Sequence, residues 1–224
     1  MKLENVVPWG RNLEEYRTMG LFTSKDSDKK ILGCGDGPAS VNRELTELGV
    51  TVTSIDPVYQ FTKEQIQKRV EETSDIVAQQ LREHSDDFVW NNIKDVDALV
   101  ALRLAAMDAF LEDYTKGKEE KRYQHQELPS LDFEDNAFDL VWSSHFLFLY
   151  SEHFDTVFHL DAIKEMLRVA KEVRIFPLLD LTNRPSPHLK TVLDYINEHG
   201  YTYEIIKSDY EFQKGAFEML QIKK

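Results

Sequence analysis

The sequence predicts an α/β fold in which a doubly wound, seven-stranded and mostly parallel sheet ends in an antiparallel strand pair and carries a helical insert. Three observations lead to this prediction. Short apolar or β-branched runs alternate with amphipathic helical stretches, a pattern typical of parallel strands with helices on both faces. A glycine-rich turn, residues 33–37, follows the first apolar run. The last two runs have no helix between them, so we expect them to pair antiparallel.

The predicted strands are short, rich in apolar or β-branched residues, and bounded by turn residues. They cover residues 29–35, 50–55, 123–127, 138–143, 172–179, 201–207 and 217–223. Pro177 falls inside the fifth of these runs, which favours a position at the end of the sheet, because proline cannot donate a hydrogen bond to a neighbouring strand.

The predicted helices repeat apolar residues at helical spacing among charged ones. They cover residues 38–48, 62–82, 95–114, 154–170 and 187–199. Pro38 suits the first turn of its helix, where a missing N–H costs little. Residues 115–121 are mostly charged and are predicted to be a linker.

The chain has 224 residues, so we expect one domain, residues 1–224. Residues 62–121 exceed an ordinary strand connection and are predicted to form a helical insert, or cap. Four aromatic residues and a methionine of this insert suit either the wall of an acceptor pocket or the insert's own core, and we favour the core for most of them. These residues are Phe88, Trp90, Met107, Phe110 and Tyr114. The insert also suits a homodimer contact.

Residues 1–28 are predicted to form an N-terminal helical lid segment. In this role Trp9, Arg11 and Tyr16 would fold over a ligand. The alternative, which is equally favoured, is an ordinary aromatic helix packed on the sheet.

Composition excludes several classes of protein and site. The net charge of −13 argues against non-specific nucleic-acid binding, which needs a basic surface. A single cysteine, Cys34, excludes an internal disulfide and a zinc ribbon, and no histidine spacing suggests a metal site. No apolar run has the length of a signal peptide or of a membrane helix, so we expect no membrane partner and a cytoplasmic protein.

The glycine turn suggests a nucleoside-bearing cofactor. Gly35 and Gly37 permit a tight turn and a close approach of the backbone to a ligand. Asp56 ends the second strand about 20 residues later, where a carboxylate can accept hydrogen bonds from a ribose diol. The alternative is a tight connection followed by an Asp-Pro turn. Glycines at 33, 35 and 37 do not match the Gly-x-Gly-x-x-Gly spacing of a nicotinamide dinucleotide site.

A family resemblance narrows the choice of cofactor. Residues 128–141, LPSLDFEDNAFDLV, resemble the segment that enters the fourth strand of class I S-adenosylmethionine-dependent methyltransferases, which have a Rossmann-like fold. The final strand pair resembles the closing hairpin of the same family. The runs SSHFLFLY (143–150), VRIFPLLDL (173–181) and YEFQKG (210–215) resemble a bacterial subgroup without an assigned substrate. The resemblance extends from residue 29 to the C-terminus, apart from the insert.

The resemblance implies S-adenosylmethionine as cofactor and methyl transfer to an acceptor, for which we expect a small molecule. The glycines would pack against the methionine and ribose parts, Asp56 would bind the ribose hydroxyls, and Glu127 or Leu128 would lie beside the adenine. The residues after the fourth strand would line the cleft near the methyl group. The full predicted set is Tyr16, Gly33, Gly35, Asp36, Gly37, Asp56, Pro57, Glu127, Leu128, Ser143, Ser144 and His145.

One position departs from the family pattern. Gly33 stands where the family usually carries an acidic residue that supports the loop and the cofactor's amino group. Asp36 is our candidate to replace this charge from three positions away. The departure motivates an alternative, a non-catalytic binding or scaffold protein of the same fold. A nicotinamide-dependent oxidoreductase is a second and weaker alternative.

His145 is the candidate general base, because it follows the fourth strand and the pKa of an unperturbed imidazole lies near neutrality. The alternative is that His145 caps the next helix or packs beside Phe146.

Overall fold

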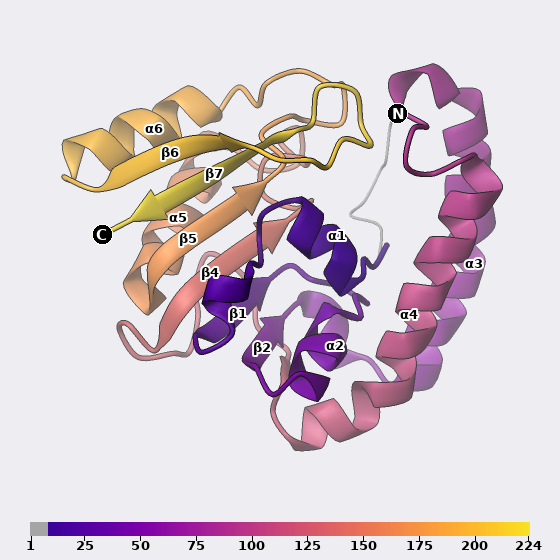
Figure 1. The fold of residues 1–224 in the computed structure, drawn as a ribbon. Coiled ribbons are helices and arrows are strands. Elements are labelled where there is room, and N and C mark those ends of the chain that lie inside the picture. Colours follow the sequence, from indigo (N-terminus) through magenta and orange to yellow (C-terminus); the bar gives the residue numbers. More distant parts are fainter. Residues whose placement is uncertain (1–8) are drawn as a thin grey trace.

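The computed structural model describes residues 9–224, which form one seven-stranded sheet covered by helices on both faces (Figure 1). The strand order is β3-β2-β1-β4-β5-β7-β6. The first five strands are parallel, and β7 runs antiparallel to both β5 and β6. The predicted fold class is therefore confirmed. The strands are β1 Lys30–Cys34, β2 Thr51–Ile55, β3 Tyr123–Gln124, β4 Phe138–Ser144, β5 Ala170–Phe176, β6 Thr202–Lys207 and β7 Glu218–Lys223.

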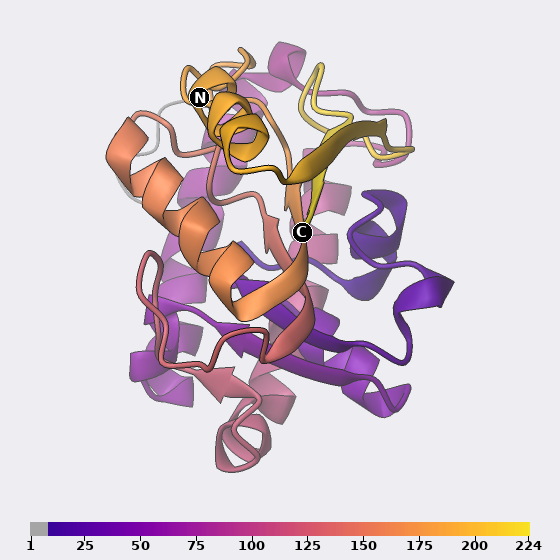
Figure 2. The same ribbon diagram turned by 90° about the vertical axis from the view of Figure 1, so that its left-hand side faces the viewer.

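Helices cover the sheet in two layers. The α5 and α6 layer lies on one face, with α1 and α2 on the other, as Figure 2 shows from the side. The two long helices α3 and α4 pack side by side along the β2 side of the sheet (Figure 1). The helices are α1 Leu13–Thr18, α2 Val41–Glu47, α3 Lys63–Glu83, α4 Val96–Glu119, α5 Thr156–Val169 and α6 Leu189–Glu198, with 3-10 turns at η1 Ser24–Asp26, η2 Pro57–Gln60 and η3 Ser85–Asp87.

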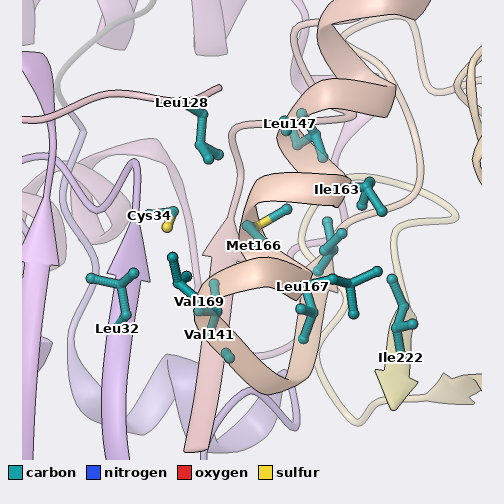
Figure 3. Close-up of a cluster of buried hydrophobic side chains, with 14 of the residues drawn as sticks. Leu32, Cys34, Leu128, Val141, Leu147, Ile163, Met166, Leu167, Val169 and Ile222 are labelled. Atoms are coloured by element: carbon teal, nitrogen blue, oxygen red, sulfur yellow. The ribbon is translucent and has the colours of Figure 1, made fainter. Parts of the chain in front are cut away.

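The sheet reverses its strand order between β1 and β4, which places a crevice at the carboxyl ends of these neighbours. Below the crevice, Leu32 of β1 and Val141 of β4 are fully buried against Ile163 and Met166 of α5 (Figure 3). Such close packing allows little movement of the strand ends. The loops that leave β1, β2 and β4 therefore start from fixed positions.

Two predicted strands end earlier than expected. β3 stops at Gln124 instead of residue 127, because it is a sheet edge and the chain turns away so that Glu127 bridges Ser130. β5 stops at Phe176 instead of Leu179, because Pro177 has no N–H to donate to a neighbouring strand.

Two predicted helices also differ. α2 begins at Val41 rather than Pro38, and the backbone N–H of Ser40 donates instead to the carbonyl of Arg11 at 3.1 Å. The predicted linker 115–121 is wrong in its first part, because α4 continues to Glu119. Its last turn carries basic side chains, which stabilise a helix C-terminus, and Lys118 Nζ donates to the carbonyl of Tyr59 at 2.9 Å. The remaining ends coincide with the prediction or differ by one or two residues.

Residues 9–28 of the predicted lid form α1, where Asn12 and Glu15 form a capping box, and the 3-10 turn η1. The first eight residues of the predicted lid lie outside the described residues. None of the helices in residues 9–224 combines the length and the apolar character that a membrane crossing needs.

Candidate active site

A cavity of about 550 Å³ opens at the carboxyl ends of β1, β2 and β4. Its volume is in the range of sites that bind small molecules and cofactors. The glycine loop, the turns after β2 and β4, the N-terminal segment and α3 all contribute to its wall. Of the predicted set, every residue except Gly33 and Ser143 lines this cavity.

The glycine loop needs its glycines for two different reasons. Gly35 and Gly37 have φ of +75° and +57°, in the left-handed region that other residues rarely adopt. At Gly35 a side chain would also lie 2.8 Å from the ring of Phe146. Both glycines line the cavity, so the loop presents bare backbone to a ligand.

Asp36 occupies the space that a side chain at position 33 would need. A Cβ on Gly33 would lie 1.8 Å from Oδ2 of Asp36. The Asp36 carboxylate accepts hydrogen bonds from Ser54 at 2.6 Å, from Trp142 Nε1 at 3.0 Å and from Tyr16 Oη at 3.0 Å. Burial raises the pKa of Asp36, and these three donors oppose the shift by stabilising the charged form. The structure therefore puts an acidic group beside the position where Gly33 lacks one.

Asp56 links the loop after β2 to the glycine loop. Its Oδ2 accepts from the backbone N–H of Gly37 at 2.9 Å, and its Oδ1 accepts from the N–H of Val58 at 2.8 Å. Burial raises the pKa of Asp56 to about 6, although both backbone donors oppose the shift. Each carboxylate oxygen retains a lone pair for a further donor. Asp56 is thus held in place and still able to bind a pair of hydroxyls.

His145 sits in an unusual backbone conformation, with φ of +54°. Its N–H donates to the carbonyl of Phe176 at 2.6 Å, and its Nδ1 lies 3.0 Å from Ser144 Oγ. A left-handed residue that is not glycine stores strain, which clusters at functional sites. The expectation of a near-neutral pKa is wrong, because burial and then the charges of Arg11 and Arg103 lower the pKa of His145 well below its ordinary value.

Ser143 does not line the cavity, which corrects its predicted position. Neighbouring strand residues point to opposite faces, so Ser144 faces the cavity and Ser143 points into the core. Among residues 9–224, Ser143 Oγ has no hydrogen-bond partner. Gly33 likewise lies beneath the cavity floor, beside Asp36.

The insert contributes α3 side chains to the cavity, notably Arg69 and Val77. The five residues predicted for an acceptor pocket or for the insert's own core do not line this cavity. Met107, Phe110 and Tyr114 pack with Tyr59 and Tyr123, away from the cavity. The remaining pair, Phe88 and Trp90, packs against Phe212.

A buried ionic group beside His145 was not predicted from the sequence. Arg103 of α4 contacts Glu15 of α1 with both terminal nitrogens, and Tyr210 Oη donates to the same carboxylate at 3.1 Å. A signal was present in the sequence, because Arg103 lies four residues from both Leu99 and Met107 on the buried face of the helix. A lone charge on such a face needs a partner.

Comparison with known proteins agrees with this geometry. The sequence model for the methyltransferase domain family matches residues 94–176. The chain is 33% identical over 225 residues to MJ0045, an uncharacterized protein of Methanocaldococcus jannaschii, with 100% of this chain and 99% of the relative covered.

Two crystal structures share the fold. The PH0226 protein of Pyrococcus horikoshii has a TM-score of 0.50 at 15% identity, with 94% of this chain and 88% of that chain covered. The methyltransferase domain of bacterial CtHen1-C has a TM-score of 0.51 at 14% identity, with 95% and 98% covered. The chain belongs to the class I methyltransferases, enzymes whose methyl donor is S-adenosylmethionine.

Proposed function

We propose that the protein transfers a methyl group from S-adenosylmethionine to a small molecule bound in the 550 Å³ cavity. The observation that carries this proposal is that one cavity joins the glycine loop and Asp56 to His145. Proximity of this kind lets a protein align two reactants and exclude water, which is most of what methyl transfer requires.

The residues near the glycine loop fit the cofactor. Asp36, Asp56 and Glu127 give this part of the cavity three carboxylates, which suit a ligand with an ammonium and a sulfonium group. Asp56 would hold the ribose hydroxyls, while Leu128 and Pro57 would bound the adenine. When bound, the cofactor supplies an activated methyl group. Because Asp36 supplies an acid beside Gly33, we favour a functional cofactor site over a non-catalytic protein of the same fold.

His145 would act as the base that removes a proton from the acceptor. In the tautomer that carries its proton on Nδ1, His145 donates to Ser144 Oγ at 3.0 Å, and the Ser144 hydroxyl in turn donates to Met19 Sδ at 3.8 Å. In this tautomer Nε2 is unprotonated and able to accept a proton. The lowered pKa keeps the imidazole neutral at pH 7, as a base must be.

A small acceptor is favoured over a macromolecule because of the cavity walls. Leu149, Phe154 and Phe158 make an apolar wall beside the turn that follows β4, and Trp9 and Val77 contribute from the N-terminal segment and α3. We propose that α3 and α4 act as a cap on the acceptor. The acidic net charge disfavours a nucleic acid.

Cofactor binding is tested by titration calorimetry with S-adenosylhomocysteine. We expect the wild type to bind it and not to bind NAD, and we expect Asp56→Ala to weaken binding about 30-fold, because a charged acceptor of two hydroxyls is lost. Asp132→Ala, an exposed carboxylate outside the cavity, is the matched control and should bind like the wild type. Wild-type binding of NAD in place of S-adenosylhomocysteine would overturn the proposal.

The affinity for S-adenosylhomocysteine should depend on pH. Because burial raises the pKa of Asp56 to about 6 in the free protein, protonation removes an acceptor of the ribose hydroxyls as the pH falls through 6. We expect the affinity to fall about tenfold per pH unit below that point. The stability of the free protein should show the opposite trend, with the contribution of Asp56 lost as the pH rises through 6. Asp56→Asn should flatten both profiles.

The acceptor class is tested with methyl-labelled cofactor and a cell extract separated by ultrafiltration. We expect the label to enter the low-molecular-weight filtrate, and transfer at a cofactor concentration below saturation should fall with the Asp56→Ala variant. Labelling confined to protein or RNA would contradict the small-molecule proposal and leave the cofactor assignment intact.

A further inference from the structure

Two arginine side chains, Arg11 and Arg103, lie beside His145, and the carboxylate of Glu15 forms its ion pair with Arg103. Arg103 is 1% exposed, and its Nη2 donates to Glu15 Oε1 at 2.6 Å while its Nη1 contacts Oε2. Tyr210 Oη donates to Oε1 of the same carboxylate. Both oxygens of Glu15 are therefore engaged by Arg103 and Tyr210.

Arg11 has weaker partners. Its Nη1 donates to the carbonyl of Trp9 at 3.3 Å, Arg103 repels its charge, and Glu15 and the hydroxyl of Tyr210 stabilise it. Burial together with Arg103 lowers the pKa of Arg11. A guanidinium nevertheless stays charged, so the cluster holds two positive charges against one negative charge, in a chain whose net charge is −13.

Two donors of this cluster are unused, and the two arginines that carry them line a common space. Among residues 9–224, Nε of Arg11 and Nε of Arg103 are both buried and have no hydrogen-bond acceptor. Both arginines line a small cavity of about 80 Å³, room for a few water-sized groups. This space shares His145 and Arg11 with the main cavity. Asp87 also lines it, but it is not among the groups that act most strongly on either guanidinium.

We propose that the methyl acceptor carries an anionic oxygen group, a carboxylate or a phosphate, which binds between Arg11 and Arg103 in the small cavity. Buried, desolvated guanidinium donors bind such groups strongly. That the ligand of this site is the methyl acceptor rests on the proposed function, whereas the anion site itself rests on the two arginines.

The surrounding side chains describe the rest of the ligand. Trp9, Val77, Leu149 and Leu181 line both cavities, so the body attached to the anion meets an apolar wall. His145 also lines both cavities. The acceptor is therefore an apolar body with one anionic group, and its nucleophilic atom lies on the side of His145.

The charges of the two regions complement the two reactants. Carboxylates surround the glycine loop, where the cationic cofactor would bind, and the unpaired guanidinium donors lie beyond His145. Opposite potentials at the two ends would disfavour binding of either reactant in the wrong orientation.

The proposal is tested by titrating the protein, saturated with S-adenosylhomocysteine, with benzoate and with the neutral, equally sized benzamide. Phenyl phosphate forms a third arm that separates carboxylate from phosphate selectivity. We expect one of the two anions to bind the wild type about tenfold more tightly than benzamide. Equal binding of all three probes would overturn the proposal.

Substitutions test whether the preference for an anion over benzamide comes from Arg11 and Arg103. Arg11→Gln should reduce the anion preference about tenfold, and Arg11→Lys should retain part of it because the charge remains. Arg69→Gln, which removes an exposed cation from the main cavity, and Arg17→Gln, which removes an exposed cation of α1 outside both cavities, are the controls and should keep the preference. A preference that survives Arg11→Gln, or that is lost with Arg69→Gln, would overturn the assignment.

Binding of S-adenosylhomocysteine is the second readout. We expect Arg11→Gln to bind it like the wild type, which also shows that the variant is folded. A loss of this affinity comparable to that of Asp56→Ala would assign Arg11 to the cofactor's own carboxylate and overturn the proposal. If the wild type failed to bind S-adenosylhomocysteine but preferred an anion over benzamide, the proposed function would fail while the anion site would stand.

Discussion

A Gly33→Ala variant is expected to lose about 3 kcal/mol of unfolding free energy and most of its affinity for S-adenosylhomocysteine. The added Cβ would lie 1.8 Å from Oδ2 of Asp36 and 2.7 Å from Nε1 of Trp142. Both neighbours are buried, and β1 is held between β2 and β4, so none of them can move aside cheaply. A single methyl group is therefore expected to displace the Asp36 carboxylate.

The displacement is costly because of what Asp36 binds. The carboxylate accepts hydrogen bonds from Tyr16, Ser54 and Trp142, and moving it leaves these buried donors and a buried charge without partners. The glycine loop that carries Asp36 also carries Gly35 and Gly37, so the cofactor surface should move with it. Chemical denaturation and calorimetry measure the two losses.

A double-mutant cycle separates overpacking from the loss of the acid. In an Asp36→Ala background, Gly33→Ala should cost less, because the closest neighbour is gone. Gly33→Asp with Asp36→Ala should recover affinity lost by Asp36→Ala alone, because the acid returns to almost the same place. Gly49→Ala is the control: at φ of +82° with no atom near its Cβ, it should lose about 1 kcal/mol and no affinity. Purely additive effects at 33 and 36 would contradict the replacement of one acid by the other.

The fold could be predicted from the sequence because its signals are local. Each strand is a short apolar run, and the helical periodicity of α3 and α4 is carried by residues within each helix. The predicted ends of helices were wrong where contacts with residues distant in the sequence decide where the helix begins or ends. The start of α2 depends on the N-terminal segment, whose Arg11 carbonyl takes the N–H of Ser40. The length of α4 depends partly on Tyr59, whose carbonyl accepts from Lys118.

The residues of the candidate site also fall into those that local sequence signals predict and those that depend on distant contacts. Gly35, Gly37 and Asp56 were predictable, because a motif fixes their spacing and a strand end fixes their place. The position of the Asp36 carboxylate at the missing side chain of Gly33 was only a possibility in the sequence, since it depends on rotamers and on Trp142 of another strand. The Arg103–Glu15 pair joins residues 88 positions apart, and no local pattern shows which acid serves which base.

His145→Asn is expected to reduce methyl transfer between about 10²- and 10⁴-fold and to leave the affinity for S-adenosylhomocysteine unchanged. Asparagine tolerates the positive φ of +54° at this position, so the substitution removes the base without adding backbone strain. The measurement is the rate of label transfer into the low-molecular-weight filtrate at saturating cofactor. Ser144→Ala tests the tautomer and should reduce the rate less, because the ring remains but its Nδ1 partner is lost.

The matched control is His153→Asn, an exposed histidine outside the cavity, which should transfer at the wild-type rate. A histidine that only packs would instead show its effect in stability, through its contacts with Phe176 and Tyr210. Rate and stability therefore discriminate the two roles. A His145→Asn variant with a near wild-type rate would remove His145 from the chemistry and would favour an acceptor whose nucleophile is already deprotonated.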